Sequence, residues 1–98
     1  MKNAIKNRCL KALQNTMLEK YYSPYQFCIG GYSEECICFN EDNSQWIISR
    51  FEHGQIEIIG EYSNILDGCL AYIEANSSGD EEIQELKDIF ITNLFIRG

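Results

Sequence analysis

The first part of the chain alternates apolar and polar positions with the period of a helix. Apolar or small side chains recur every three or four residues, with Lys, Asn, Gln and Arg between them. This spacing places them on one face, so we expect an amphipathic helix over residues 2–19. That face consists of Ile5, Cys9, Ala12, Leu13, Thr16 and Met17. The helix should end before Tyr21, because Pro24 disfavours a helical conformation in the residue that precedes it.

From residue 25 the pattern changes to short runs of aromatic and β-branched residues separated by turn residues. Such runs are typical of strands, and their order predicts an antiparallel meander. The four predicted strands cover residues 25–30, 36–40, 45–52 and 55–62. The predicted turns are Gly30-Gly31, residues 41–44, and His53-Gly54. The last suits a two-residue hairpin because glycine readily adopts positive φ.

The last third of the chain returns to helical spacing. Ser63 is a candidate cap for a helix that ends near Asn76, although Gly68 weakens it. Its apolar face consists of Ile65, Leu66, Cys69, Tyr72 and Ile73. Asp80 is a candidate cap for a third helix, with the apolar face Ile83, Leu86, Phe90 and Leu94. Residues 89–96 are apolar all round; we favour helix there, with a fifth strand as the alternative.

These elements predict an α+β fold: one helix, a four-stranded antiparallel meander and two C-terminal helices. The 98 residues are enough for a single domain, residues 1–98. A hydrophobic fraction of 45% is sufficient for a packed core and excludes a disordered tail.

The predicted turns also indicate which side chains share a face of the sheet. The His53-Gly54 turn places Phe51 opposite Ile56. If the pairing continues regularly, Ile48 lies opposite Ile59 and Trp46 lies opposite Glu61. The preceding turn places Phe39 opposite Trp46. One face is small and apolar and is expected to pack under the helices. It carries Cys36, Cys38, Ile47, Ser49, Phe51, Ile56, Ile58 and Gly60.

The other face mixes large apolar groups with charges, a combination that suits a protein-binding patch. Aromatic side chains are favoured at the centre of an interface and charged ones at its rim. The expected partner-binding residues are Phe39, Trp46, Ile48, Arg50, Glu52, Glu57, Ile59 and Glu61. The alternative is that the N-terminal helix covers this face and leaves its carboxylates at the margin.

Charge is unevenly distributed along the chain. The net charge is −7; residues 1–18 carry four basic and no acidic residues, whereas residues 34–88 carry fourteen acidic residues against Arg50 and Lys87. An acidic body attracts basic partners and disfavours nucleic acid. No apolar run is long enough to cross a membrane, and the N-terminus does not resemble an export signal, so we expect a cytoplasmic protein without membrane contact.

The residues with reactive side chains do not form a recognisable catalytic set. Five cysteines on a chain without an export signal are expected to be reduced, and Cys28, Cys36 and Cys38 are interpreted as small apolar residues. A zinc or redox cluster of these three, or a nucleophile pair with His53, is the alternative. We expect no enzyme activity, no catalytic residue, no metal and no cofactor.

One segment resembles a family of proteins. Residues 46–54, Trp-Ile-Ile-Ser-Arg-Phe-Glu-His-Gly, are followed by a strand, Tyr62, and a helix with Ala71 and Tyr72. This is similar to an element of small immunity proteins from bacterial polymorphic toxin systems, including contact-dependent growth inhibition, although His53 stands where arginine is usual. The resemblance implies a cytosolic, non-enzymatic protein that binds and neutralises a cognate toxin domain, many of which are nucleases with cationic clefts.

The leading hypothesis is therefore an immunity protein that acts as a monomer or weak homodimer on a basic toxin domain. The alternative is an acidic adaptor, secretion chaperone or regulatory subunit without catalytic activity.

Overall fold

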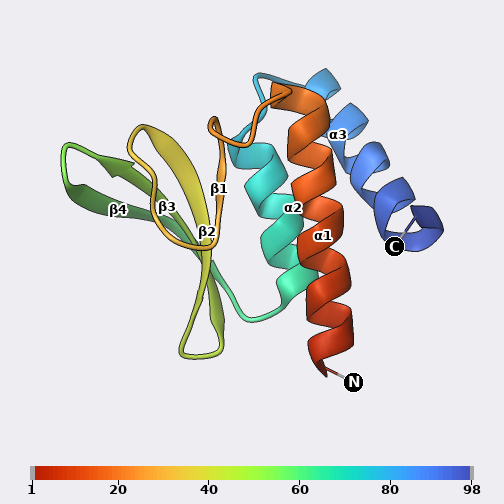
Figure 1. Cartoon of the computed structure of the whole chain (residues 1–98), viewed down its shortest axis with the longest axis horizontal. Helices are drawn as coiled ribbons and strands as arrows, with labels where there is room; N and C mark the ends of the chain where they lie inside the picture. The colour runs from red at the N-terminus through yellow and green to blue at the C-terminus, as the bar shows by residue number, and fades with distance from the viewer. Residues whose placement is uncertain (1, 98) are drawn as a thin grey trace.

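The computed structural model describes residues 2–97 and shows an α+β fold of two layers, a sheet on one side and three helices on the other (Figure 1). The helices are α1 (Lys2–Tyr21), α2 (Ile65–Ala75) and α3 (Asp80–Thr92), and α3 continues into a π-helical turn, η1 (Asn93–Arg97). The strands are β1 (Cys28–Ile29), β2 (Cys36–Asp42), β3 (Gln45–Glu52) and β4 (Gln55–Tyr62). The predicted order of elements is confirmed.

The sheet has the order β1-β2-β3-β4 and is mixed rather than fully antiparallel. The predicted first strand, residues 25–30, is reduced to Cys28 and Ile29 and runs parallel to β2. Its direction follows from Gly30 and Gly31, whose positive φ values of 85° and 92° bend the chain into a loop back to the start of β2. The Asn40 side chain holds this loop, because it accepts from the Gly31 N–H at 2.6 Å and donates to its carbonyl at 2.8 Å.

Both hairpins have two-residue turns, at Asn43-Ser44 and His53-Gly54, with positive φ at all four residues. This conformation matches the twist of the flanking strands. The predicted pairing of Phe51 with Ile56 is confirmed.

Beyond this point a bulge at Ile59 shifts the register of β4 by one residue. Ile48 therefore faces Gly60 rather than Ile59, and Trp46 faces Tyr62 rather than Glu61. On the other side of β3, Phe39 faces Ile48 rather than Trp46, a shift of two residues that leaves the face of each side chain unchanged.

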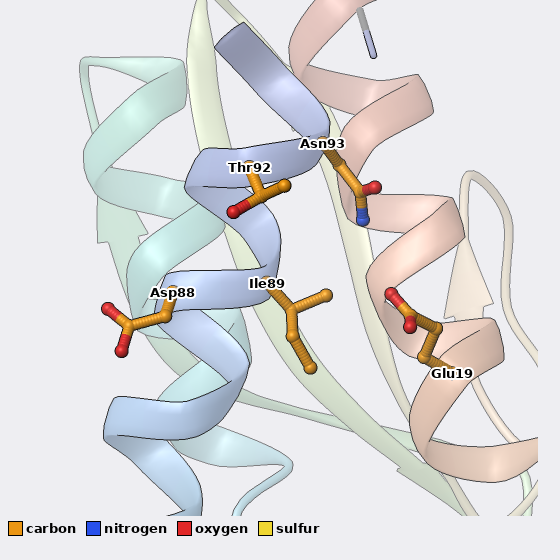
Figure 2. A pocket seen from close by; sticks show the side chains of 5 residues that line it. All are labelled: Glu19, Asp88, Ile89, Thr92 and Asn93. Atoms are coloured by element: carbon orange, nitrogen blue, oxygen red, sulfur yellow. The ribbon is translucent and has the colours of Figure 1, made fainter. Parts of the chain in front are cut away.

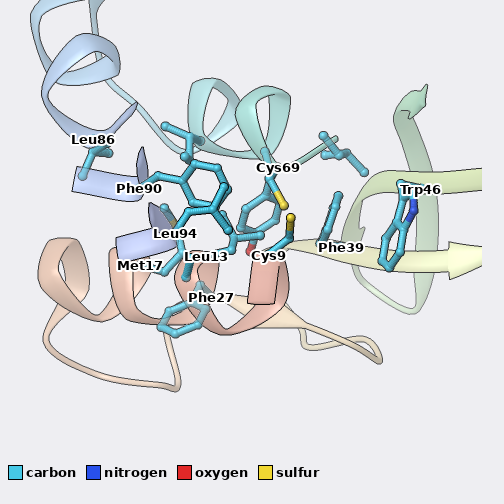
Figure 3. Packing of buried hydrophobic residues seen from close by; sticks show 14 residues of the cluster. Cys9, Leu13, Met17, Phe27, Phe39, Trp46, Cys69, Leu86, Phe90 and Leu94 are labelled. Carbon is cyan, nitrogen blue, oxygen red and sulfur yellow. The ribbon is translucent and has the colours of Figure 1, made fainter. Parts of the chain in front are cut away.

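The core begins between the sheet and α2, where Phe39 and Trp46 lie near Cys9 and Cys69, and continues among the three helices, where Phe90 packs (Figure 3). The predicted helix faces are buried or partly buried, except that Ile5 is 60% exposed. Tyr72 fastens α2 to the sheet: its hydroxyl donates to the Ile37 carbonyl at 2.7 Å. Burial raises the pKa of this phenol, so the donor stays protonated.

The helix ends differ slightly from the prediction. Asn64, not Ser63, caps α2 by accepting from the amides of Leu66 and Asp67. Gly79 occupies the cap position of α3, and Asp80 is its first residue. Residues 89–96 are helical, as favoured. No helix within residues 2–97 is both long and apolar enough to span a membrane.

Candidate functional site

The centre of the predicted binding patch is buried. Phe39, Trp46 and Ile48 are only 1%, 7% and 1% exposed, so these three belong to the core and do not form the exposed centre that was predicted. Helix α2 covers them: a Cβ on Gly68 would lie 3.1 Å from the Phe39 ring and from the Cβ of Trp46. A helix does cover this face, but it is α2 rather than the N-terminal helix that the alternative named; α1 packs beside α2.

The other predicted contact residues lie at the surface. Arg50, Glu52, Glu57, Ile59 and Glu61 are all exposed, on β3 and β4. The Arg50 guanidinium lies 3.4 Å from the Glu57 carboxylate across the hairpin. These five remain predicted contact residues.

The opposite face of the sheet was expected to lie under the helices, and the structure shows it largely open. Ile56 and Ile58 on β4 are 51% and 57% exposed. The loop of residues 30–35 covers only the part near β1, where Cys36, Cys38 and Ser49 are buried. Within this loop Tyr32 sets its ring edge-on to Phe51 at 6.0 Å between centroids. We call this open side the outer face.

The outer face contains a hollow of about 450 Å³. Its floor is formed by Ile47, Ile56 and Ile58, and Tyr32 forms one wall. The polar residues that line it are Asn40, Glu41, Asp42 and Glu61. Of the predicted contact residues, only Glu61 belongs to this hollow, because the prediction assigned the two faces of the sheet the wrong way round.

The surroundings of this hollow are strongly acidic. Residues 34–62 contain seven carboxylates, one arginine and one histidine. Lys6 binds Glu41 at 2.9 Å, but among the described side chains no basic group lies within ion-pair distance of Asp42 or Glu61. The hollow thus combines an apolar floor with two carboxylates that a cation from another molecule can reach.

Cys28, near the sheet edge, is a protonated thiol. Cys28 and Cys38 are neighbours across β1 and β2. Burial, followed by the nearby Cys38 and Cys36 thiols, raises the pKa of Cys28 to about 12. A protonated thiol is a poor nucleophile at neutral pH. No group of three or more metal-binding side chains occurs in the part of the chain that the structure describes.

His53 lies exposed in its hairpin turn, where its backbone N–H donates to the Glu34 carboxylate. Nothing on that turn orients the imidazole toward a nucleophile.

A second hollow, of about 210 Å³, lies between α1 and α3 (Figure 2). It is lined by Glu19 on α1, by Asp88, Ile89 and Thr92 on α3, and by Asn93 at the start of η1. Asn93 is 4% exposed and donates to the Thr16 hydroxyl at 3.2 Å, which fixes the packing of the two helices. This hollow therefore reflects helix packing and offers less apolar surface than the outer face.

Comparison of the chain with known protein families, curated proteins and solved structures finds no significant match.

Proposed function

We propose that this protein is a cytoplasmic immunity protein that binds and neutralises a basic bacterial toxin domain. The observation that supports this best is the hollow on the outer face, in which an apolar floor adjoins Asp42 and Glu61. Apolar surface with a charged rim is typical of a protein-binding site. A small molecule with a single charge needs only one carboxylate, whereas several carboxylates surround this hollow.

The hollow fits a lysine or arginine side chain of the partner. Such a side chain buries its aliphatic stem on apolar surface while its charged end stays at the edge. Here the stem would lie on Ile56 and Ile58, and the charged end would reach the carboxylates of Asp42 or Glu61. The acidic field accelerates encounter with a cationic domain by about 10- to 1000-fold at low salt.

The direct test is co-expression with the protein encoded beside this chain's gene, scored by rescue of growth from that neighbour's toxicity. The wild-type chain should rescue growth and bind the neighbour's toxic domain one to one. Absence of both rescue and binding would refute the proposed function.

The site is tested by double charge reversal, Asp42→Lys with Glu61→Lys. We expect the association rate to fall at least about tenfold at low salt and the loss to shrink as salt screens the field. The matched control, Glu19→Lys with Glu85→Lys, changes the net charge equally on the helical layer and should have a smaller effect. Equal losses for both variants would remove the hollow from the site.

The apolar floor is tested separately. Ile58→Ser should raise the dissociation rate, because it removes contact area without altering charge. Ile91→Ser on α3 is the control: Ile91 is also exposed, at 40%, but lies in the helical layer.

A further inference from the structure

Strand β4 forms one edge of the sheet, and no strand within residues 2–97 pairs with its outer side. The strand is eight residues long, and each residue from Gln55 to Ile59 is exposed. Three of these residues are isoleucines, Ile56, Ile58 and Ile59. A long apolar edge is a template for pairing with another chain, and proteins usually block it with a covering segment or inward-pointing charges.

The hairpin turn determines which peptide groups of β4 are free. In an antiparallel pair, residues joined by two hydrogen bonds alternate with residues that are not hydrogen-bonded to the partner strand. The pair flanking a two-residue turn is hydrogen-bonded, so Gln55 and Glu57 use their peptide groups on β3. Ile56 and Ile58 therefore direct both N–H and C=O away from the sheet, toward the open edge.

The bulge at Ile59 limits the length of this template. A bulge interrupts the alternation of peptide groups and bends the strand. The regular part of the open edge is therefore Gln55 to Ile58, which offers the two donors and two acceptors of Ile56 and Ile58.

Charge decides between the possible occupants of this edge. If two copies of the chain paired through these groups, Ile56 of one copy would face Ile58 of the other. The two Glu57 side chains would then lie directly opposite each other. Like charges at opposed positions destabilise a strand pair. A strand with lysine or arginine opposite Glu57 has no such repulsion and gains an ion pair.

We propose that β4 binds an extended basic segment of the partner as an added strand, paired along residues 55–58. The segment has the pattern apolar, basic, apolar. Its basic residue lies beside Glu57, and its apolar residues extend the surface formed by Ile56 and Ile58. This inference rests on the proposed function, because it describes how the same outer face and its edge engage a basic partner.

The test uses the full chain labelled with ¹⁵N and the synthetic peptide acetyl-Thr-Val-Lys-Val-Thr-amide as probe. We expect shifts of the Ile56 and Ile58 amide resonances, and exchange of these two amides slowed about tenfold at saturation. The Gln55 and Glu57 amides serve as internal controls, since they are already bonded to β3 and should change little. A peptide with glutamate in place of lysine should bind more weakly.

Two variants separate backbone pairing from side-chain contact. Ile58→Pro removes the outward N–H but no bond to β3, and should abolish the protection at Ile56, whereas Ile58→Val should preserve it. Should the proline variant not fold, Glu57→Lys decides: it should reverse the preference, so that the glutamate peptide binds better than the lysine peptide.

Three results would overturn the added strand. Shifts confined to Tyr32, Ile47 and Asp42 would show that the peptide occupies the hollow alone, and would leave the proposed function intact. Protection of Ile56 and Ile58 without peptide, together with a dimer by sedimentation, would identify a second copy as the occupant. Absence of any binding would remove this edge from the interaction, while growth rescue tests the function independently.

Discussion

Gly68 offers a quantitative test of how closely helix α2 approaches the sheet. A Cβ added there would lie 3.1 Å from two atoms of the Phe39 ring and 3.1 Å from the Cβ of Trp46. Both aromatic residues are buried, and their rings stack at 5.2 Å between centroids, so neither can move away freely. The substitution Gly68→Ala therefore sets a gain in helix propensity against a packing conflict.

The two effects can be compared directly. Alanine in a helix interior is favoured over glycine by about 1 kcal/mol. Overpacking of a well-packed core typically costs about 1–3 kcal/mol. We expect the conflict to dominate and the free energy of unfolding to fall by about 1 kcal/mol, which corresponds to about 4–8 °C in Tm for a domain of this size.

Urea unfolding, followed by the fluorescence of Trp46, the only tryptophan, measures this change next to the contact itself. The double variant Gly68→Ala with Phe39→Leu is the control. The smaller side chain gives the new methyl group room, so the cost of Gly68→Ala should shrink in that background. If Gly68→Ala instead raises stability by the full propensity gain, the close approach of α2 to the sheet is refuted.

Three further predictions concern the cap, a thiol and an ion pair. Gly79→Ser should raise the free energy of unfolding by about 0.5 kcal/mol, because the serine Cβ would meet open space and the serine hydroxyl can cap α3. Thermal melting measures this change, and a loss of stability would contradict the cap geometry. Alkylation of Cys28 by iodoacetamide at pH 8 should be much slower than alkylation of free cysteine, and it should accelerate as pH approaches the raised pKa of about 12. If Cys28 and free cysteine react at equal rates at pH 8, the raised pKa is contradicted. The hydrogen bond from Lys20 lowers the pKa of Glu82, so Glu82→Gln should reduce stability at pH 7. Urea unfolding should show that this loss of stability disappears as pH falls below the usual carboxylate pKa, because the wild-type carboxylate is then protonated too. A loss that persists in acid would exclude the ion pair as its cause.

Helix positions could be predicted from the sequence because their signal is local. In α1 the three- and four-residue spacing places Leu13 and Met17 on one face, and both are fully buried. The first strand could not be predicted in the same way. Its direction depends on how Asn40, on the next strand, holds Gly31, and such a contact between segments leaves no periodic pattern.

The face of the sheet was misassigned for a related reason. Strand alternation grouped Phe39, Trp46 and Ile48 correctly, but it does not say which group the helices cover. The structure shows that the larger side chains form the core, with Gly68 providing the space above them. A glycine in the middle of an otherwise apolar helix was the available signal, and it indicates a close helix–sheet contact rather than only a weakened helix.

The division of the molecule into two layers has a practical consequence. The described chain starts in α1 and finishes in η1, both in the helical layer, whereas the outer face is directed away from that layer (Figure 1). An affinity tag, fluorophore or fused domain attached after η1 would extend from the helical layer, whereas the start of α1 lies nearer the hollow, because Lys6 binds Glu41 at its rim. Protein immobilised through its C-terminal end would consequently present the open sheet to solution.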